Sequence, residues 1–337
     1  MLKTCNNDGK LVDLYGRRIT YLRLSVTDRC NLRCRYCMPL QDFTRLPSEA
    51  ILTYEEIVRI CQILTRLGVK KIRLTGGEPL VRQGIMDLIG RLGKIEGIGE
   101  LCLTTNGVLL KKYAGGLFRA GVRHLNISLD SLRPERFAAV TGRDLFSSVW
   151  KSLETVLEMG FSPVKINSVI MKGINDDEIP ALAGLTLQHP FEVRFIEFMP
   201  IGGKSTWSPE KMMSCREIKE RIEEAYGALK PVARSSNAGP ANVYGLEGAP
   251  GRIGFISPLS NHFCGTCNRL RLTAEGHLRL CLFSDEEINV KEALRKGMTL
   301  RELTEFFRQA VRKKPEGYRT GGRRAPSCSR GMSAIGG

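Results

Sequence analysis

Residues 19–37 read Ile19-Thr-Tyr-Leu-Arg-Leu-Ser-Val-Thr-Asp-Arg-Cys30-Asn-Leu-Arg-Cys34-Arg-Tyr-Cys37, a β-rich run that leads directly into three closely spaced cysteines. Further β-rich runs follow at intervals, with helical patterns between them. The runs are Ile19–Val26, Lys71–Leu74, Glu100–Thr104, His124–Leu129, Val164–Met171 and Val193–Phe198. Such β–helix–β repeats predict an α/β fold in which about six right-handed units form a partial (βα)6 TIM-like barrel. The active site of such a barrel lies at the carboxyl ends of its strands, where the three cysteines follow the first strand.

One helix pattern illustrates the segments between the strands. Tyr54–Leu67 places apolar residues on one face, Thr53 and Glu56 can form a capping box, and Gly68 can end the helix. We therefore expect a helix on the outer side of the sheet at this position.

The regular alternation stops after Pro200, which predicts three parts. Residues 1–215 form the barrel with the first cysteine group, 216–316 form a smaller α+β segment, and 317–337 form a flexible tail. The second segment has a strand pattern at Ile253–Ser257, a hairpin turn at Glu275-Gly276, and short helix patterns near Val290–Lys296 and Leu300–Val311.

Charge and hydropathy limit the classes of protein that fit. The 337 residues contain 51 Lys and Arg against 35 Asp and Glu, a formal net charge of +16, which predicts an anionic partner. Charge alone leaves nucleic acid, a nucleoside triphosphate and a membrane surface open. No apolar stretch approaches the roughly 18 residues of a membrane span, and residues 1–10 show no targeting pattern, so we expect a cytoplasmic protein.

Six of the eleven cysteines form two groups of three. Cys30, Cys34 and Cys37 follow the first strand, whereas Cys264, Cys267 and Cys281 lie in the second segment. Structural zinc usually takes four protein ligands, but three thiolates on a [4Fe–4S] cluster leave one iron open. Zinc with a distant fourth ligand is the alternative for the first group, and a zinc knuckle with His262 or His277 is the alternative for the second.

The CxxxCxxC spacing, with Tyr36 before the third cysteine, resembles the radical S-adenosylmethionine superfamily. Thr75-Gly-Gly-Glu-Pro79 is similar to the GGEP segment of that superfamily. The resemblance implies that the open iron binds the methionyl amine and carboxylate, and that one electron from the cluster generates a 5′-deoxyadenosyl radical.

Three longer stretches resemble a narrower family, the GTP 3′,8-cyclases of molybdenum cofactor biosynthesis. They are Tyr21–Cys30, Phe195–Pro200 and Phe263–Leu272, and the carboxyl-terminal Gly336-Gly337 also matches. The resemblance implies that the radical abstracts the ribose 3′ hydrogen of GTP. The ribose radical then closes on guanine C8 to give (8S)-3′,8-cyclo-7,8-dihydroguanosine 5′-triphosphate, while the second [4Fe–4S] cluster holds the guanine.

The same resemblance assigns site residues. Those implied for S-adenosylmethionine are Tyr36, Gly77, Ser128 and Met199; those implied for GTP are Arg23, Arg73, Thr104, Lys165, Arg269, Leu270 and Arg271; those implied for the two clusters are Cys30, Cys34, Cys37, Cys264, Cys267 and Cys281. Arginine forks and a lysine charge on barrel strands suit a triphosphate. Gly336 and Gly337 are implied to enter the barrel mouth, because glycines fit a narrow channel, and to act in catalysis.

The implied partners are GTP, a one-electron reductant and, downstream in the pathway, a cyclic pyranopterin monophosphate synthase. We expect no membrane or nucleic-acid partner, and the chain could form a homodimer. Two alternatives stay open at this point. One is another radical enzyme with an auxiliary cluster that acts on RNA or a peptide, which the basic stretch Arg319–Arg330 would suit. The other is a nucleic-acid-binding protein held together by two zinc sites.

Overall fold

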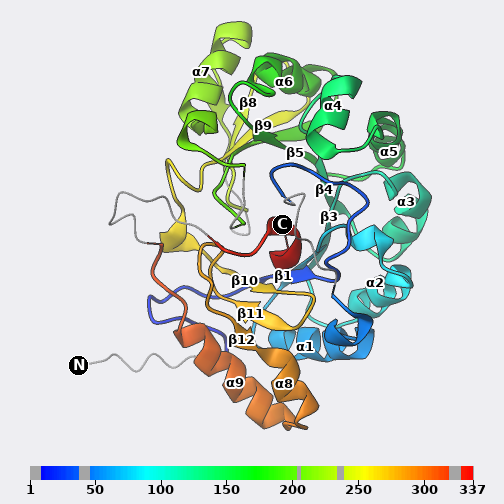
Figure 1. Ribbon diagram of the computed structural model, residues 1–337, viewed down its shortest axis with the longest axis vertical. Helices are drawn as coiled ribbons and strands as arrows, with labels where there is room; N and C mark the ends of the chain where they lie inside the picture. The colour runs from blue at the N-terminus through cyan, green and yellow to red at the C-terminus, as the bar shows by residue number, and fades with distance from the viewer. Residues whose placement is uncertain (1–8, 38–45, 203–205, 234–238, 319–327, 337) are drawn as a thin grey trace.

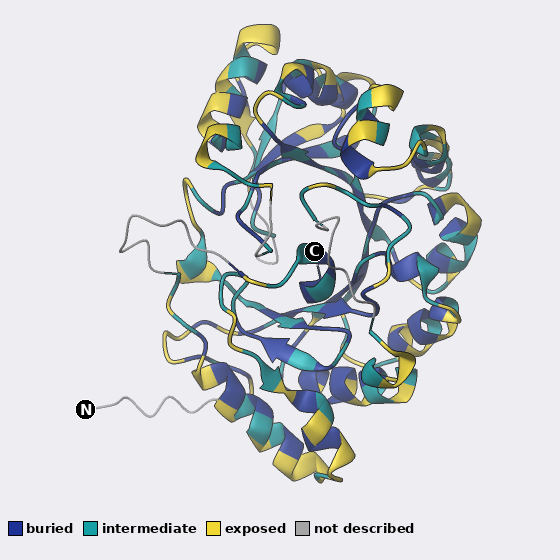
Figure 2. Cartoon of the chain, viewed as in Figure 1, coloured by how far each residue is buried: buried dark blue, intermediate teal, exposed yellow. Residues whose placement is uncertain are grey.

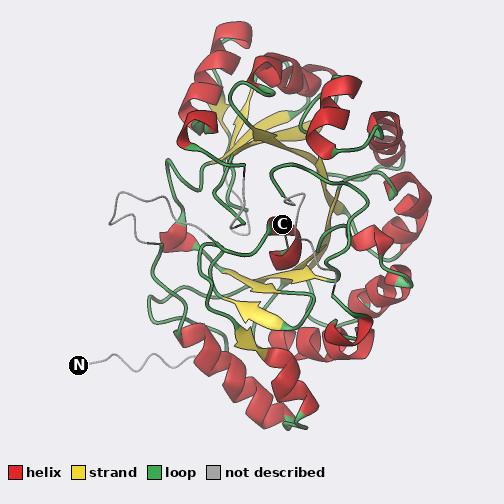
Figure 3. Ribbon diagram, viewed as in Figure 1, coloured by secondary structure: helices red, strands yellow, loops and turns green. Residues whose placement is uncertain are grey.

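One curved sheet surrounds the centre of the molecule, and helices cover its outer side (Figures 1 and 3). The computed structural model describes residues 9–37, 46–202, 206–233, 239–318 and 328–336. Over these ranges the strand order is β12-β11-β10-β1-β2-β3-β4-β5-β6-β9-β8-β7. β1 to β6 are neighbours in chain order and run parallel, which confirms the predicted partial α/β barrel.

The strands are β1 (Tyr21–Ser25), β2 (Lys71–Thr75), β3 (Glu100–Thr105), β4 (His124–Ser128), β5 (Val164–Ile170), β6 (Phe191–Glu197), β7 (Lys230–Pro231), β8 (Asn242–Gly245), β9 (Arg252–Ile256), β10 (Arg269–Leu272), β11 (His277–Arg279) and β12 (Ile288–Asn289). The helices are α1 (Tyr54–Arg66), α2 (Ile85–Gly93), α3 (Leu110–Arg119), α4 (Pro134–Thr141), α5 (Phe146–Glu158), α6 (Ile179–Gln188), α7 (Cys215–Tyr226), α8 (Val290–Arg295), α9 (Leu300–Arg312) and α10 (Met332–Ile335). Short 3₁₀ turns are η1 (Ser48–Ala50), η2 (Pro79–Val81), η3 (Asp176–Glu178), η4 (Pro209–Lys211) and η5 (Cys264–Thr266).

The carboxyl-terminal segment extends the barrel sheet at both edges. β9 pairs in parallel with β6, and β10 pairs in parallel with β1. The hairpin predicted at Glu275-Gly276 joins β10 to β11, and Gly276 has the positive φ of +86° that such a turn requires. The boundaries at 215 and 316 stay predictions, but the strands that follow the first boundary contribute to the same sheet.

Local sequence explains why α1 begins and ends where it does. The Thr53 hydroxyl accepts a hydrogen bond from the backbone N–H of Glu56, and the Glu56 carboxylate accepts one from the backbone N–H of Thr53. This predicted capping box satisfies two backbone donors at the start of the helix. Gly68, with a φ of +100°, follows its last turn.

Strand alternation places polar side chains inside the barrel. In β5, Val164, Ile166 and Ile170 are buried in the core between sheet and helices. Successive side chains of a strand point to opposite faces, so Lys165 and Asn167 face the inner side, where they line a pocket. The chain thus has an apolar layer outside the sheet and polar side chains inside it. Figure 2 shows that the strands are largely buried. Among the helices of the described ranges, none has the length and apolar character needed to cross a membrane.

The docking of α9 provides a test of this packing. Phe307 is fully buried on α9, which packs against α1, whereas Leu300 on the same helix is 47% exposed. We expect Phe307→Ala to lower the free energy of unfolding by about 3–5 kcal/mol, because it leaves a cavity in the core. Leu300→Ala, as the control, should change it by less than about 0.5 kcal/mol. Anaerobic urea unfolding would measure both, and equal losses would contradict the packing described.

Candidate active site

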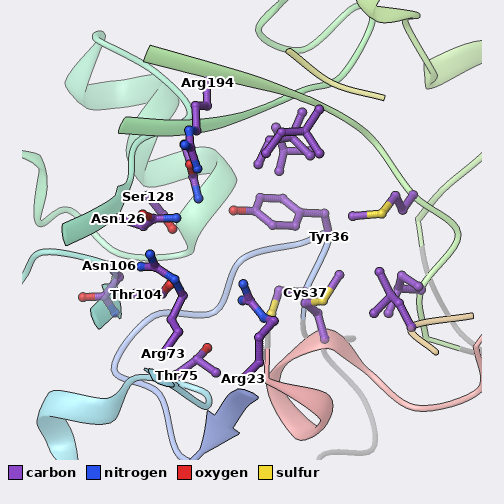
Figure 4. Close-up of a pocket in the computed structure, with 18 of the residues that line it drawn as sticks. Arg23, Tyr36, Cys37, Arg73, Thr75, Thr104, Asn106, Asn126, Ser128 and Arg194 are labelled. Atoms are coloured by element: carbon purple, nitrogen blue, oxygen red, sulfur yellow. The ribbon is translucent and has the colours of Figure 1, made fainter. Parts of the chain in front are cut away.

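The first cysteine group lies at the mouth of the barrel. Cys30, Cys34 and Cys37 all line one large pocket together with Tyr36 (Figure 4). Burial and the neighbouring thiolates raise the pKa of Cys34 well above its usual value, and burial with the charge of Cys30 raises that of Cys37 to about 12. The sulfur atoms are thus close enough to repel one another when ionised, a repulsion that a bound cation would relieve.

Hydrogen-bond donors surround these sulfur atoms. The backbone N–H of Leu32 lies 3.4 Å from Cys30 Sγ, and Asn106 Nδ2 lies 3.7 Å from the same atom. The backbone N–H of Ser333, near the carboxyl terminus, donates to Cys37. Such donors stabilise thiolate charge, which is the form of cysteine that binds metal.

The arrangement of the cysteines separates the metal alternatives. Across the residues that the structure describes, no three Cys, His, Asp or Glu side chains converge on a single ion. Structural zinc gathers its ligands into one tetrahedral shell. In a [4Fe–4S] cluster the cysteines bind different irons and need only face a shared space. Three thiols around one pocket fit that requirement.

The second cysteine group lines a smaller cavity that adjoins the first pocket. Cys264, Cys267 and Cys281 surround it, and Arg269 and Arg271 line both cavities. Burial opposes ionisation of Cys267, but Arg269 and Lys314 outweigh it and bring its pKa to about 7. This group therefore already has one thiol poised to ionise near neutral pH.

Two buried cations that the sequence did not single out hold the second cysteine group in place. Arg17 donates to the carbonyl oxygens of Cys264 and Glu316, each at 2.7 Å. Lys314, which is 2% exposed, donates to the carbonyl of Arg269 at 2.9 Å and also to that of Leu280. Cys267 and Cys281 lie close enough to act on the pKa of Lys314. Both cations thus tie the cysteine loops to the barrel.

The two histidines considered as zinc ligands have other contacts. His277 Nδ1 lies 3.4 Å from the carboxylates of both Glu275 and Glu287. His262 packs edge-on against Tyr318, with ring centroids 5.4 Å apart. His262 also lines the smaller cavity beside Cys264, Cys267 and Cys281.

Seven basic side chains line the large pocket. They are Arg23, Lys71, Arg73, Lys165, Arg194, Arg269 and Arg271. Arg23, Arg73 and Arg271 occupy equivalent register positions on neighbouring strands. Burial and the neighbouring arginines lower the pKa of Arg271 well below its usual range. Cations crowded in this way favour a polyanion.

Some of these cations have acidic partners. Lys71 lies 2.5 Å from Glu100, Arg194 lies 2.5 Å from Glu192, and Lys165 lies 3.8 Å from Glu192. Arg73 donates to the Tyr21 hydroxyl at 2.8 Å and to the carbonyl of Leu103 at 2.9 Å. Asp130 and Glu197 also line the pocket, but seven basic side chains line it as well, so positive charge prevails.

Leu270 differs in orientation from the two arginines beside it, and its contact with GTP stays a prediction. Its prediction as a GTP contact came with Arg269 and Arg271, but strand alternation turns its side chain to the opposite face of β10. Leu270 is fully buried in the core and aligns with Leu22 of β1. Its side chain therefore packs against apolar neighbours, while the flanking arginines face the pocket.

The remaining predicted residues for both ligands line the large pocket: Tyr36, Gly77, Ser128, Met199, Arg23, Arg73, Thr104, Lys165, Arg269 and Arg271. Tyr36 donates a 2.7 Å hydrogen bond to Asp130, a buried carboxylate whose pKa burial raises to about 6. No sequence pattern singled out Asp130 as a site residue, because its role depends on the hydrogen bond from Tyr36, which comes from a distant part of the chain.

The Gly76-Gly77 pair has a packing role that the sequence reasoning did not anticipate. A Cβ atom at Gly77 would lie 2.4 Å from the Arg29 carbonyl oxygen, and one at Gly76 would lie 2.4 Å from that of Thr27. Glu78 then accepts hydrogen bonds from the backbone N–H of Asn106 at 2.6 Å and from the Thr105 hydroxyl at 2.8 Å. The segment therefore fixes the loop that carries the cysteines against the ends of β2 and β3.

Residues 328–336 pack into the mouth of the barrel, which differs from the flexible tail expected from residue 317. Ile335 is fully buried, and the Gly336 carbonyl accepts hydrogen bonds from Arg271 Nη1 at 2.7 Å and Arg23 Nε at 3.3 Å. Arg330 binds Glu275 at 2.5 Å and Glu287 at 2.9 Å, which anchors the segment. Gly337 lies outside the described residues, so its role stays a prediction.

Comparison with known protein families agrees with this geometry. Residues 24–186 match the Radical SAM superfamily, and residues 191–320 match Molybdenum Cofactor Synthesis C. The crystal structure of Streptococcus suis SuiB bound to S-adenosylmethionine superposes with a TM-score of 0.59 at 16% identity, covering 92% of this chain and 71% of that one. The fold is therefore that of the Radical SAM superfamily.

Two curated relatives define the family more closely. A GTP 3′,8-cyclase from Thermodesulfovibrio yellowstonii is 50% identical over 306 residues, covering 90% of this chain and 94% of the relative. Another from Syntrophomonas wolfei is 46% identical over 327 residues, covering 97% and 100%. The chain belongs to the GTP 3′,8-cyclase family. This membership confirms the predicted cofactors, S-adenosylmethionine and [4Fe–4S] clusters.

Gly336 allows a direct test of the packed terminus. Its φ is +77°, and a Cβ there would lie 3.0 Å from Thr75 Cγ2. We expect Gly336→Ala to lower turnover about tenfold or more, since an L-residue in this conformation costs roughly 1–2 kcal/mol and crowds Thr75. Anaerobic product formation would measure it. Gly90→Ala, at a helical position with open space, is the matched control and should keep wild-type turnover. Normal turnover in Gly336→Ala would contradict a role for this segment.

Proposed function

We propose that the large pocket carries out the GTP 3′,8-cyclase reaction, the first step of molybdenum cofactor biosynthesis. The observation that supports this most directly is a pocket lined by basic side chains that reaches from one cysteine group to the other. A nucleoside triphosphate has the charge that the middle of this pocket favours, and its base can reach the second cavity through Arg269 and Arg271.

The binding roles follow the layout of the pocket. S-adenosylmethionine lies at the mouth, against Tyr36, Gly77, Ser128 and Met199, and Cys30, Cys34 and Cys37 hold the first cluster beside it. GTP lies deeper, with Arg23, Arg73, Lys165, Arg269 and Arg271 around its triphosphate and Thr104 nearby. Cys264, Cys267 and Cys281 hold the second cluster at the guanine end. All these side chains line the two adjoining cavities.

When bound, the first cluster and S-adenosylmethionine supply the one-electron chemistry that removes the ribose 3′ hydrogen of GTP. The chain itself positions the ribose and excludes other hydrogen donors from the site. Arg23 and Arg271 link the substrate pocket to Gly336, so the carboxyl-terminal segment covers the mouth. Ring closure between ribose and guanine then occurs in a space shielded from water.

A one-electron reductant and a downstream cyclic pyranopterin monophosphate synthase are the partners that this reaction implies. The synthase need only accept the released product, so no stable complex is required. A homodimer and a cytoplasmic location stay predictions.

Turnover under anaerobic conditions tests the function. Protein reconstituted with iron and sulfide is incubated with S-adenosylmethionine, dithionite and GTP, and mass spectrometry follows 5′-deoxyadenosine and a cyclised GTP product. Both should form only when GTP is present. Deoxyadenosine without any change to GTP would reject GTP as the substrate and direct the search to RNA or peptides.

The pH dependence of GTP binding tests the triphosphate site. Burial and the nearby Arg194 lower the pKa of Lys165 to about 8, so Lys165 is charged below pH 8 and neutral above it. Burial opposes ionisation of Tyr21, but Arg73 and Arg23 bring its pKa to about 8, which adds negative charge over the same range. We expect GTP affinity to fall above pH 8, with Lys165 and Tyr21 each contributing up to about tenfold per pH unit.

Equilibrium binding between pH 7 and 9 would measure this decline. Lys165→Arg keeps a positive charge over the whole range, so it should flatten the curve. A decline that persists unchanged in both Lys165→Arg and Tyr21→Phe would show that these groups do not contact the phosphates.

A further inference from the structure

Three residues that line the large pocket each have a buried side-chain oxygen with no hydrogen-bond partner within the described residues. These atoms are Thr104 Oγ1, Asn126 Oδ1 and Asn167 Oδ1. Asn126 is the most enclosed of these residues that the sequence did not single out, with 5% of its surface exposed. A buried polar atom without a partner is costly, so such atoms at a pocket usually await a ligand.

Two other asparagines, Asn106 and Asn175, are satisfied, whereas Asn167 Oδ1 on β5 is orphaned like Asn126 Oδ1. Asn106 Nδ2 donates to Asn31 at 2.7 Å. Asn175 Nδ2 donates to the carbonyls of Asp130 and Val169 at 2.7 Å and 2.9 Å, and its Oδ1 accepts from the N–H of Met171 at 2.8 Å. Asn126 Oδ1 thus lacks a partner because of where Asn126 lies, on the inner face of β4.

The register places Asn126 between two residues of the proposed substrate site. Thr104 of β3 and Lys165 of β5 are its direct neighbours across the sheet. Adjacent strands lie about 4.8 Å apart, so the Thr104 and Asn126 side chains can contact neighbouring groups of one ligand. Figure 4 shows Thr104, Asn126 and Ser128 on one side of the pocket and Tyr36 on the other.

The chemistry of the orphaned atoms defines the ligand group. A carbonyl oxygen only accepts, so Asn126 Oδ1 needs a hydrogen-bond donor, and a phosphate group does not supply one. In a nucleoside triphosphate held by Arg73 and Lys165, the donors next to the phosphates are the ribose hydroxyls. We propose that Asn126, beside Thr104, binds the ribose diol of the nucleotide, with Asn126 Oδ1 accepting a hydrogen bond from a ribose hydroxyl. This inference rests on the proposed function.

S-adenosylmethionine also carries a ribose diol, and the register favours the substrate as its source. Ser128 aligns with Asn167 and Arg194, two positions closer to the carboxyl ends of the strands and to the first cysteine group. Asn126 lies deeper, in the row of Thr104 and Lys165. The ribose at this depth is that of GTP.

Equilibrium binding to cluster-loaded protein under anaerobic conditions tests the assignment. The ligands are GTP, 2′-deoxy-GTP, 3′-deoxy-GTP and, separately, S-adenosylmethionine. Wild-type protein should bind GTP about tenfold more tightly than at least one deoxy analogue, the loss of one hydrogen bond. Asn126→Ala should weaken GTP binding about tenfold, leave binding of that analogue nearly unchanged, and keep the affinity for S-adenosylmethionine.

Thr104→Val is a second variant with almost the same shape, which removes only the hydroxyl, and it should also reduce the discrimination between GTP and a deoxy analogue. Thr65→Val is its matched control. Thr65 Oγ1 is likewise buried without a partner, but it lies on α1 outside the pocket, so discrimination should stay at the wild-type value.

The outcomes are distinct. Equal weakening of GTP and both deoxy analogues in Asn126→Ala, or no weakening at all, would overturn the ribose contact. A selective loss of S-adenosylmethionine affinity would overturn the assignment to the substrate. Failure of the wild-type protein to bind GTP would reject the proposed function and the inference with it, whereas tight GTP binding without any discrimination would reject the inference alone.

Discussion

The structure depends on a concentration of positive charge inside a barrel of parallel strands. Arg23, Arg73 and Arg271 lie side by side in the register, with Lys165 and Arg194 across the pocket. Their mutual repulsion and their burial are costly. Glu100 pairs with Lys71 and Glu192 pairs with Arg194, which compensates part of this charge. An anionic substrate would relieve the remainder.

The same strands that carry these cations also fix the two cysteine groups at opposite ends of the pocket. The loop after β1 presents the first group, and Gly76-Gly77 lets β2 pack against that loop without a gap. The segment before β10 presents the second group, and β10 pairs directly with β1. One pair of neighbouring strands thus sets the relation between both cysteine groups.

Sequence periodicity was enough to predict the barrel, because parallel strands buried on their outer face give short β-rich runs between amphipathic helices. Capping and turn residues also placed α1 and the β10–β11 hairpin correctly. The resemblance brought together most of the site residues, and ten of those predicted for the two ligands line one pocket. The side chain of Leu270 lies in the core and not in the pocket, because a strand turns alternate side chains to opposite faces, so its contact with GTP stays a prediction.

The residues that the sequence missed act through contacts between distant segments. Asp130 matters because Tyr36 donates to it, and Arg17 matters because it holds the carbonyls of Cys264 and Glu316. Neither has a local pattern that distinguishes it from an ordinary charged residue. Only the resemblance led us to expect Gly336 and Gly337 at the barrel mouth, since residues 328–336 have little local propensity for structure. Arg330 and Gly336 acquire defined positions only because Glu275, Glu287, Arg23 and Arg271 are already held by the sheet. The position of residues 328–336 therefore depends on the barrel, because the arginines and glutamates that hold this segment belong to the sheet and its loops.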